Sequence, residues 1–228
     1  MRKISGVSVV QFSALVTLEA GLAVAVAACA VMPWFGPDFR GIAAVVSAIL
    51  AFYCLAIATF RVLQALAPVP SGAIEPGSPG ERRAFLYMLH YLLLFNPLIF
   101  SRTLPFPLMR LLLQALGAKM GNNSYCAGIM MDPQFVTMGD NSIIGNSAMI
   151  IPHVIEGDQL GYHPVRIGNR VTIGARAIIM TDVEIGDDAT VAIQSVVAKG
   201  TRIAAGETWG GTPARRIREK EDGARLRA

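Results

Sequence analysis

Aliphatic residues recur every six positions in the second half of the chain, and this period constrains the fold more than any other feature. The aliphatic positions are Met138, Ile144 and Ile150, followed after an interruption by Ile167, Ile173, Ile179, Ile185, Val191, Val197 and Ile203. The residue four places further on is small or β-branched almost throughout. Two inward positions per six-residue face and three faces per coil predict a triangular parallel β-helix with a narrow aliphatic core.

The first half of the chain has the composition of membrane helices. Of all 228 residues, 53% are hydrophobic and only 16% are charged, whereas about a quarter are charged in an ordinary soluble protein. Residues 7–32 and 41–60 are each long enough to cross a bilayer core at 1.5 Å per residue. We therefore expect two transmembrane helices, joined by residues 33–40 with Trp34 and Phe35 at the membrane interface.

The distribution of charge indicates which side of the membrane the ends of this hairpin occupy. Residues 1–120 hold nine Lys or Arg and four Asp or Glu, while residues 121–228 hold eleven and twelve. The positive excess flanks the outer ends of the apolar segments, which predicts that both ends face the cytoplasm of a bacterial-type inner membrane. An excess confined to the apolar half gives no reason to expect nucleic-acid binding.

Cysteines and local features leave some alternatives open. Three scattered cysteines without a CxxC pair predict neither a disulfide framework nor a zinc site. The apolar start could also be a secretory signal, although its length and the second span favour a membrane helix. Glu19 is unusual at bilayer depth, and it could be protonated, paired with another chain or facing a polar cavity.

A linker and a third apolar stretch separate the hairpin from the repeats. Residues 68–80 are rich in Pro, Gly and Ser, and residues 84–101 carry no charge. Because Asn96-Pro97 should break this stretch and basic residues flank both of its ends, we expect helices that lie in the membrane interface. The expected domains are the hairpin at 1–67, linker and interfacial helices at 68–119, the β-helix at 120–217 and a charged tail at 218–228.

The rows IGNRVT, IGARAI, IGDDAT and VAIQSV resemble the hexapeptide-repeat acyltransferases, and the ending GGTPARRI resembles the signature that closes their domain. The resemblance implies a left-handed parallel β-helix, assembly as a homotrimer, and acetyl-CoA or another acyl-CoA as co-substrate, with no metal. The handedness follows from the resemblance alone. Together with the hairpin it implies a membrane-anchored O- or N-acyltransferase whose catalytic domain is cytoplasmic and whose acceptor is an envelope saccharide or lipid-linked molecule.

The interruption between Ile155 and Ile167 is where we expect the active site, because a regular solenoid needs no such insertion. The resemblance implies that His153, at the root of this loop, is the general base. Glu156 and Asp158 are the nearest carboxylates in sequence that could orient its ring, and Glu156 is assigned with His153 to the catalytic set. His163 is expected at the acceptor. The expected acceptor-binding residues are His163, Asp158 and Tyr162.

The resemblance also implies a coenzyme site near the end of the coil. Lys199 corresponds to the lysine of an SxVxK motif, and Arg215 to the basic residue after Pro-Ala, with Arg216 as an adjacent substitute. The small residues expected beside the thiol arm are Ala192, Ser195, Gly210 and Gly211. Two other functions stay open: an inactive trimeric scaffold, and an enzyme like the gamma-class carbonic anhydrases, which needs three histidines converging on zinc, whereas only His153 and His163 lie in the repeat domain.

Overall fold

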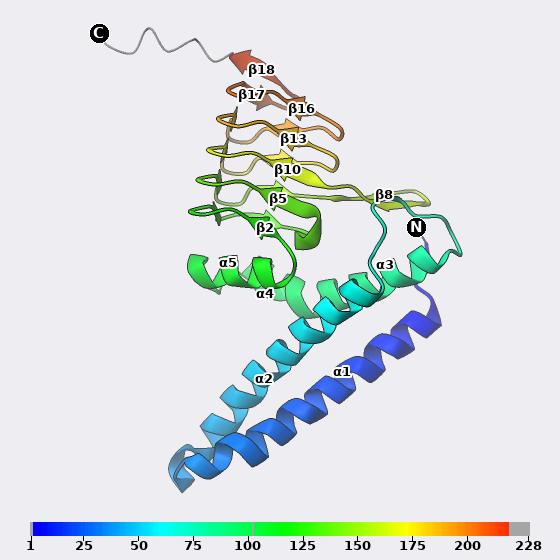
Figure 1. Ribbon diagram of the computed structural model, residues 1–228, viewed down its shortest axis with the longest axis vertical. Helices are drawn as coiled ribbons and strands as arrows, with labels where there is room; N and C mark the ends of the chain where they lie inside the picture. The colour runs from blue at the N-terminus through cyan, green and yellow to red at the C-terminus, as the bar shows by residue number, and fades with distance from the viewer. Residues whose placement is uncertain (1, 102, 219–228) are drawn as a thin grey trace. The chain divides into compact units, whose positions relative to one another are not determined.

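The computed structural model describes residues 2–101 and 103–218, which form two compact units (Figure 1). One unit is helical and comprises residues 2–69 and 75–95. The other comprises residues 70–74 and the described chain from residue 96 onward. The segment expected as a linker, residues 68–119, contributes to both units. The expected tail lies, apart from residue 218, outside the described residues.

Two long helices, α1 (Gly6–Val26) and α2 (Pro37–Leu66), form an antiparallel pair in the helical unit. Ser5 caps α1, because its hydroxyl accepts a hydrogen bond from the backbone N–H of Ser8 at 3.1 Å. A π-helical turn at Ala27–Val31 and a 3-10 turn at Met32–Trp34 complete the reversal. Helix α2 then begins with Pro37, which already has a helical φ and lacks only an N–H that would be unpaired there.

Three helical segments of the described chain are long and apolar enough to cross a membrane by length and composition: Gly6–Trp34, Pro37–Leu66 and Pro79–Ser101. The first two are the helices of the predicted hairpin. The third contains the segment expected in the interface, so both its interfacial position and the membrane crossing of the hairpin stay predictions.

The expectation that Asn96-Pro97 breaks the third segment is wrong. Helix α3 (Pro79–His90) continues through a π-helical turn at Tyr91–Phe95 into α4 (Asn96–Ser101). A proline inside an α-helix lacks an N–H, and its ring collides with the carbonyl four residues earlier. The wider π turn immediately before Asn96 relieves this conflict and lets the helical path continue.

Glu19 faces the packed interior of the helical unit. Only 4% of the residue is exposed, and its carboxylate oxygens have no hydrogen-bond partner among the described residues. His90 on α3 is fully buried beside α1, with its ring edge-on to Phe12 at 4.9 Å between centroids. The Nδ1 atom of His90 is 2.8 Å from the carbonyl of Leu86. Glu19 is therefore placed by helix packing and not on the outer surface of the helices.

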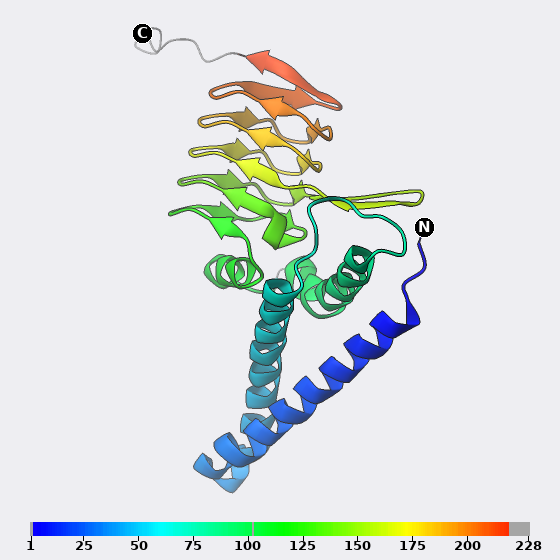
Figure 2. The ribbon, with the colours of Figure 1, turned by 45° about the vertical axis from the view of Figure 1, so that its right-hand side comes forward.

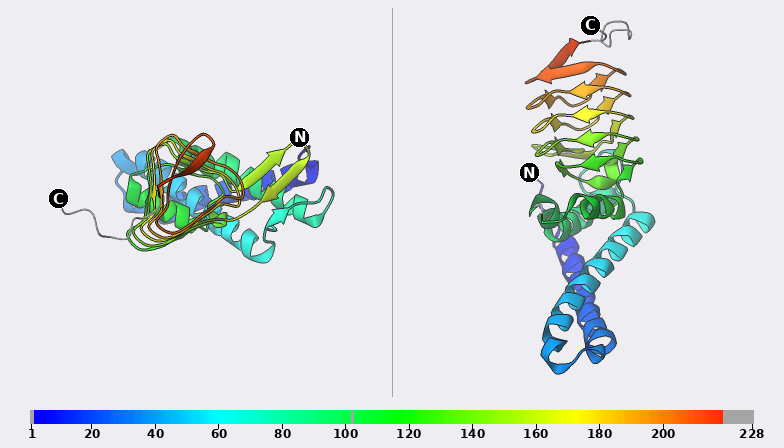
Figure 3. Two further views of the ribbon diagram at one scale, coloured as in Figure 1. Left: turned by 90° about the horizontal axis from the view of Figure 1, so that it is seen from above. Right: turned by 90° about the vertical axis from the view of Figure 1, so that its left-hand side faces the viewer.

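The second unit is a parallel β-helix of triangular cross-section, as the view along its axis shows (Figure 3). One wall contains β2 (Lys119–Met120), β5 (Val136–Met138), β10 (Val165–Ile167), β13 (Glu184–Ile185) and β16 (Arg202–Ile203). The second contains β3 (Tyr125–Cys126), β6 (Ile143–Ile144), β11 (Thr172–Ile173), β14 (Thr190–Val191), β17 (Thr208–Gly211) and β18 (Ala214–Arg218). The third contains β4 (Ile129–Met130), β7 (Met149–Ile150), β12 (Ile178–Ile179) and β15 (Val196–Val197).

The six-residue period is confirmed as the spacing of the inward side chains. Equivalent residues of successive coils pair in parallel, so Ile173 lies beside Ile144 and Val191, and all three are buried. The glycine after several of these isoleucines is required by close coil stacking. A Cβ at Gly174 would lie 2.5 Å from the backbone nitrogen of Ile193, which is closer than real Cβ contacts. The parallel coil is thus confirmed, and its handedness stays a prediction.

The expected β-helix, 120–217, includes the first coil, but the inward positions before Met138 were not identified, because their spacing is irregular. Inward residues Met120 and Cys126 are six apart, but Met130 follows Cys126 after only four residues. Strand β4 still pairs in register with β7, so one turn of this coil is two residues shorter than its equivalent. Helix α5 (Phe106–Ala115) packs against β3 through Met109, Leu112 and Leu113, which are buried.

The three walls differ in what they present outward. Outward residues of the first wall, such as Arg166, Glu184 and Arg202, are charged, and those of the second are mixed, with Tyr125 and Ile143 followed by Thr172 and Thr190. The outward residues of the third wall are apolar along its whole length: Ile129, Met131, Met149, Ile151, Ile178, Met180 and Val196. All but Ile129 are half-buried. One wall of the β-helix therefore offers a continuous apolar surface.

The predicted interruption of the repeat is a β-hairpin that leaves the coil (Figure 2). Its strands are β8 (His153–Glu156) and β9 (Gln159–Tyr162), which pair antiparallel. A short strand from the linker, β1 (Gly72–Ala73), pairs with the free edge of β9 and makes a three-stranded sheet. The linker thus contacts the insertion where the active site is expected.

Candidate active site

His153 and Asp132 form the closest ionisable pair at the root of the hairpin. The Nδ1 atom of His153 is 2.5 Å from Oδ2 of Asp132. The side chain of His153 is 22% exposed, whereas that of Asp132 is 5% exposed. The pair therefore combines a buried carboxylate with an imidazole that reaches solvent.

The coil geometry brings these two residues together although they are 21 positions apart in sequence. Asp132 follows β4 and precedes a 3-10 turn at Pro133–Phe135, and its own φ is 45°. That left-handed conformation is one that aspartate tolerates better than most residues. His153 opens β8 directly after the next coil has passed the third wall, so the two residues stand one coil apart.

This arrangement sets the tautomer of the imidazole. An ionised carboxylate only accepts hydrogen bonds, so the hydrogen shared with Asp132 belongs to Nδ1 of His153. The lone pair of the neutral ring then lies on Nε2, for which the described chain supplies no hydrogen-bond partner. A histidine held in this way can accept a proton at Nε2, while the carboxylate stabilises the resulting positive charge.

The expected orienting carboxylates lie elsewhere. Glu156, at the end of β8, accepts hydrogen bonds from Nζ of Lys199 at 2.9 and 3.2 Å. Asp158 lies in the turn of the hairpin, next to Gly157 with its φ of 58°. Asp132 occupies the position beside His153 that was expected for Glu156. Sequence distance misled here, because the hairpin carries Glu156 and Asp158 away from the residue that begins it.

Tyr162, expected at the acceptor, is buried and packs beside the pair, and its role in acceptor binding stays a prediction. The residue is 2% exposed and lies opposite His153 in the hairpin register. Its ring stacks on Phe135 with 4.9 Å between centroids and meets the His153 ring edge-on at 6.4 Å. Phe135, which sequence reasoning missed, thus packs against the Tyr162 ring that lies beside His153.

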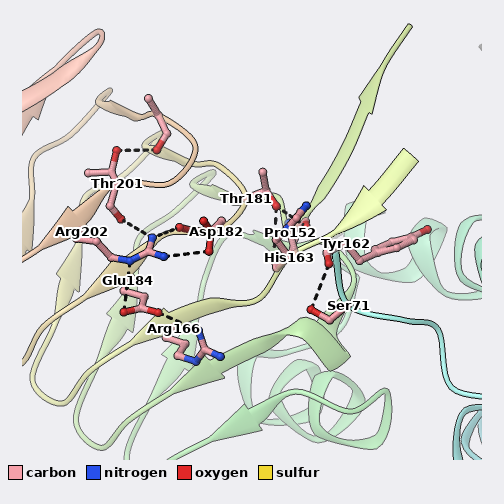
Figure 4. A network of polar contacts seen from close by, with 11 residues as sticks. Ser71, Pro152, Tyr162, His163, Arg166, Thr181, Asp182, Glu184, Thr201 and Arg202 are labelled. Carbon is pink, nitrogen blue, oxygen red and sulfur yellow. Dashed lines mark hydrogen bonds and ion pairs between the residues drawn. The ribbon is translucent and has the colours of Figure 1, made fainter. Parts of the chain in front are cut away.

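His163 lies where the hairpin rejoins the coil, and its backbone is firmly held (Figure 4). Its N–H donates to the carbonyl of Pro152 at 2.8 Å, and the hydroxyl of Thr181 donates to the same carbonyl at 2.7 Å. A pocket of about 250 Å³ adjoins these residues, lined among others by His163, Thr181, Val154 and Lys199. His163 and Lys199 therefore share a pocket beside the hairpin.

The residues expected at the coenzyme fall into two groups. Ser195, Gly210, Gly211 and Ala192 lie together near the last coil: the Ser195 hydroxyl accepts from the Gly211 N–H at 3.2 Å. A Cβ at Gly210 would lie 3.1 Å from Cδ1 of Ile217 and 3.2 Å from the Cβ of Ala192, so glycine lets these side chains pack closely. Lys199 is not part of this group, because it reaches Glu156 on the hairpin.

The basic residues at the end of the β-helix have different surroundings. Arg215 is exposed on β18, while Arg216 forms an ion pair with Glu207 at 3.1 Å. Hydrogen bonds from the indole of Trp209 and the backbone N–H of Ala204, together with Arg216, hold the pKa of the Glu207 carboxyl below its usual range. Arg216 is therefore engaged in closing the coil, and Arg215 is the better placed of the two for a ligand.

The described residues contain no group of three or more His, Cys, Asp or Glu side chains arranged to hold a metal ion. Asp132 is the functional candidate that sequence reasoning missed. Its only sequence signal is an acidic residue directly before a proline at a point where the six-residue period has lapsed, in the run MMDPQF.

Comparison with known proteins supports the repeat. Residues 164–199 match the bacterial transferase hexapeptide repeat (six repeats). A 93-residue stretch is 36% identical to the putative acetyltransferase YvoF of Bacillus subtilis (strain 168), covering 41% of this chain and 53% of that protein. An 85-residue stretch is 34% identical to the mitochondrial gamma carbonic anhydrase 2 of Arabidopsis thaliana, covering 37% and 26%. The chain thus spans about half or less of the length of these relatives.

Among solved structures, the chain is similar to a hexapeptide-repeat-containing acetyltransferase from Vibrio cholerae. The sequence identity is 24%, the TM-score is 0.46, and the match covers 55% of this chain and 86% of that chain. Residues 164–199 match the transferase hexapeptide repeat, in agreement with the six-residue period and the Ile-Gly dipeptides of this region.

Proposed function

We propose that this chain is a membrane-anchored acyltransferase. It would use an acyl-CoA, most simply acetyl-CoA, to acylate a hydroxyl or amine of an envelope saccharide or lipid-linked acceptor. The observation that carries the proposal is the His153–Asp132 pair at the root of an insertion in a hexapeptide-repeat coil. The match to the transferase repeat and the similarity to a putative acetyltransferase support the reaction class.

The proposed chemistry is general base catalysis by His153. A hydroxyl group is a poor nucleophile while it keeps its proton, and an imidazole with an ordinary pKa of about 6.5 can accept that proton near neutral pH. The acceptor proton would pass to Nε2 of His153, and Asp132 would hold Nδ1–H and stabilise the charged ring. The acyl-CoA supplies an activated thioester, and His153 can return its proton to the departing thiol.

The last coil is our candidate for the coenzyme because its side chains are small and a basic residue follows. Ala192 and Gly210 are partly exposed, Ser195 is buried beside Gly210, and the exposed Arg215 stands on the strand that follows. A flexible thiol arm needs a surface without bulky side chains, and a phosphate is bound well by a guanidinium. These residues are our candidates for the coenzyme site, with Lys199 as a second basic residue beside the hairpin.

The apolar third wall supports assembly as a trimer. The outward side chains of this wall are apolar and most of them are half-buried, and a flat wall of this kind can pack on a copy of itself. His153 follows Ile151 by two residues, at the point where the second coil leaves the third wall. A copy packed on this wall would therefore lie beside the proposed base. We propose a homotrimer with one site at each boundary between copies.

Coenzyme binding is the experiment that tests the function. Full-length protein in mild detergent is titrated with acetyl-CoA and with CoA by calorimetry, and its zinc content is measured separately. We expect about one coenzyme bound per chain. Absence of coenzyme binding together with bound zinc would favour the carbonic-anhydrase-like alternative suggested by the Arabidopsis relative. Absence of both would favour an inactive scaffold.

A further inference from the structure

A second pocket lies between the first coil of the β-helix and the segment that leads into α5. None of its lining residues belongs to the β8–β9 hairpin. Its volume is about 490 Å³, within the range of roughly 300–1,000 Å³ typical of ligand sites. The pocket is lined by Ile99 of α4, by Leu104, Phe106 and Met109, and by Cys126 and Ala127 of the first coil. The coil wall and the helical segment thus enclose an apolar space.

The described lining of this pocket carries no charged side chain. Cys126 is 4% exposed, and burial raises the pKa of its thiol to about 12, so it is neutral and behaves as a small apolar group. The polar side chains in the lining, Thr103 and Asn146, can hydrogen-bond to ester oxygens. The chemistry of the pocket therefore suits a long apolar group that ends in a weakly polar one.

The rim of the pocket is apolar as well. Helix α5 buries Met109 and Leu112 against the coil, yet Phe106 in its first turn, which lines the pocket, is 61% exposed, and Leu111 on the other side is 60% exposed. Phe100, at the end of α4, is also exposed. The polar side chains of α5, Arg110 and Gln114, hydrogen-bond to the first coil, so the side of the helix that faces away from the coil is apolar, as in surfaces that meet a partner or a membrane. The exposed side of α5 therefore needs an apolar medium next to it.

The path of the chain identifies that medium. Ile99 and Phe100 belong to the last turn of Pro79–Ser101, a segment long and apolar enough to cross a membrane. The pocket lining resumes at Thr103, so the chain leaves the membrane-compatible segment and enters the pocket within a few residues. This continuity holds whether the segment crosses the bilayer or lies in its interface, and in both cases lipid chains can reach the rim.

We infer that this pocket holds the hydrocarbon chain of a membrane lipid. Lipid binding there does not depend on the acyltransferase reaction. Only its meaning for the acceptor rests on the proposed function. If the domain is an acyltransferase, a lipid hydrocarbon chain bound to it favours a lipid-linked acceptor over a free saccharide.

Photolabelling tests this site directly. Full-length protein is placed in nanodiscs of phosphatidylethanolamine and phosphatidylglycerol that contain phosphatidylethanolamine with a diazirine at the end of one acyl chain. After irradiation, labelled residues are mapped by mass spectrometry. We expect label at residues 126–128 inside the pocket, in addition to label on exposed residues of α5 such as Leu108 and Leu111.

Two variants separate the pocket from the surface. Ala127→Phe fills the pocket and Thr103→Trp blocks its rim, and each should reduce label at Cys126 and Gly128 at least tenfold while label at Leu108 is unchanged. The matched control is Ile143→Phe on the outside of the second wall, which should label like the wild type. If Ala127→Phe does not fold, Thr103→Trp alone carries the comparison.

Label confined to the helices and the exposed side of α5, or label at Cys126 that survives both variants, would overturn the lipid site. Coenzyme titration of the same preparations keeps the two proposals distinguishable. A protein that binds acetyl-CoA but shows no label in the pocket lacks the lipid site, whereas a labelled protein that binds no coenzyme retains the site and contradicts the acyltransferase.

Discussion

At the scale of single residues, His153 is expected to affect turnover and not coenzyme binding. His153→Ala should lower kcat by 10²–10⁴-fold, or roughly 3–5 kcal/mol of barrier, which is what a positioned base typically contributes. Asp132→Asn should cause a smaller loss, because it keeps the size of the side chain but removes the charge that stabilises the protonated ring. Steady-state kinetics and calorimetry of the purified variants measure both quantities.

His163→Ala is the control for this assignment. Its backbone is anchored to Pro152 and the residue lines the neighbouring pocket, so we expect a smaller effect on kcat than from His153→Ala. If His163→Ala lost more turnover and His153→Ala were near normal, the base would lie in the pocket and Asp132 would be a structural partner only.

Lys199 and Arg215 are expected to act through KM for the coenzyme. Contacts with phosphate are made in the ground state and the transition state alike, so Lys199→Ala and Arg215→Ala should raise KM with little change in kcat. Glu156→Gln is the matched control for Lys199, because it breaks the same ion pair and keeps the lysine. Equal effects of Lys199→Ala and Glu156→Gln would show that the lysine only holds the hairpin.

At the scale of elements, the stability of the antiparallel pair β17–β18 at the end of the coil should depend on pH through Glu207. Its carboxylate accepts from Trp209 at 2.8 Å and from Ala204 at 3.0 Å, and its pKa is lowered in the folded chain. A lowered pKa means that the charged form adds stability above the unfolded value of about 4.3, and that this stability is lost as pH falls through the folded value.

Glu207→Gln should therefore lower the Tm of the β-helix at pH 7, and the difference from the wild type should shrink as the pH drops well below about 4. Thermal unfolding followed by circular dichroism at a series of pH values measures this. Thr201→Val, at an exposed turn of the preceding coil, is a control without a titrating group. A difference that stayed constant with pH would contradict the role of the carboxylate charge.

At the scale of the whole molecule, the third wall should hold the proposed trimer together. Ile178→Glu places a charge in the middle of this wall and should convert trimers to monomers, because a buried unpaired carboxylate costs several kcal/mol. Thr172→Glu, at the equivalent outward position of the second wall, should leave the assembly intact. Native mass measurement in mild detergent distinguishes them, and a monomeric wild type would remove the proposed sites between copies.

Membrane topology is the second prediction at this scale. Two crossings by α1 and α2 would return the chain to the side on which it starts, and the Lys and Arg residues outside both helices favour the cytoplasm. We therefore expect reporter fusions at both ends to be cytoplasmic. An exported C-terminus would show that Pro79–Ser101 crosses as a third span, and it would separate the catalytic domain from cytoplasmic acyl-CoA.

The sequence by itself determined the repetitive part of the molecule. Inward side chains in stacked coils must recur at a fixed interval. The aliphatic residues at every sixth position from Ile167 to Ile203 therefore predicted the β-helix, and the loss of this period after Ile155 predicted the insertion. The apolar runs likewise predicted the long helices α1 and α2, because a helix that lacks a polar face is visible in composition alone.

Only the tertiary structure decided the partners of individual residues. Stacking of coils joined Asp132 to His153 across 21 positions, and the antiparallel path of the hairpin took Glu156 away from His153 to Lys199. The shortened first coil and the π turn before Pro97 were equally hidden, because each is a local change of register that neighbouring segments accommodate. Periodicity reports which face a residue occupies, whereas contact across coils depends on where each turn ends.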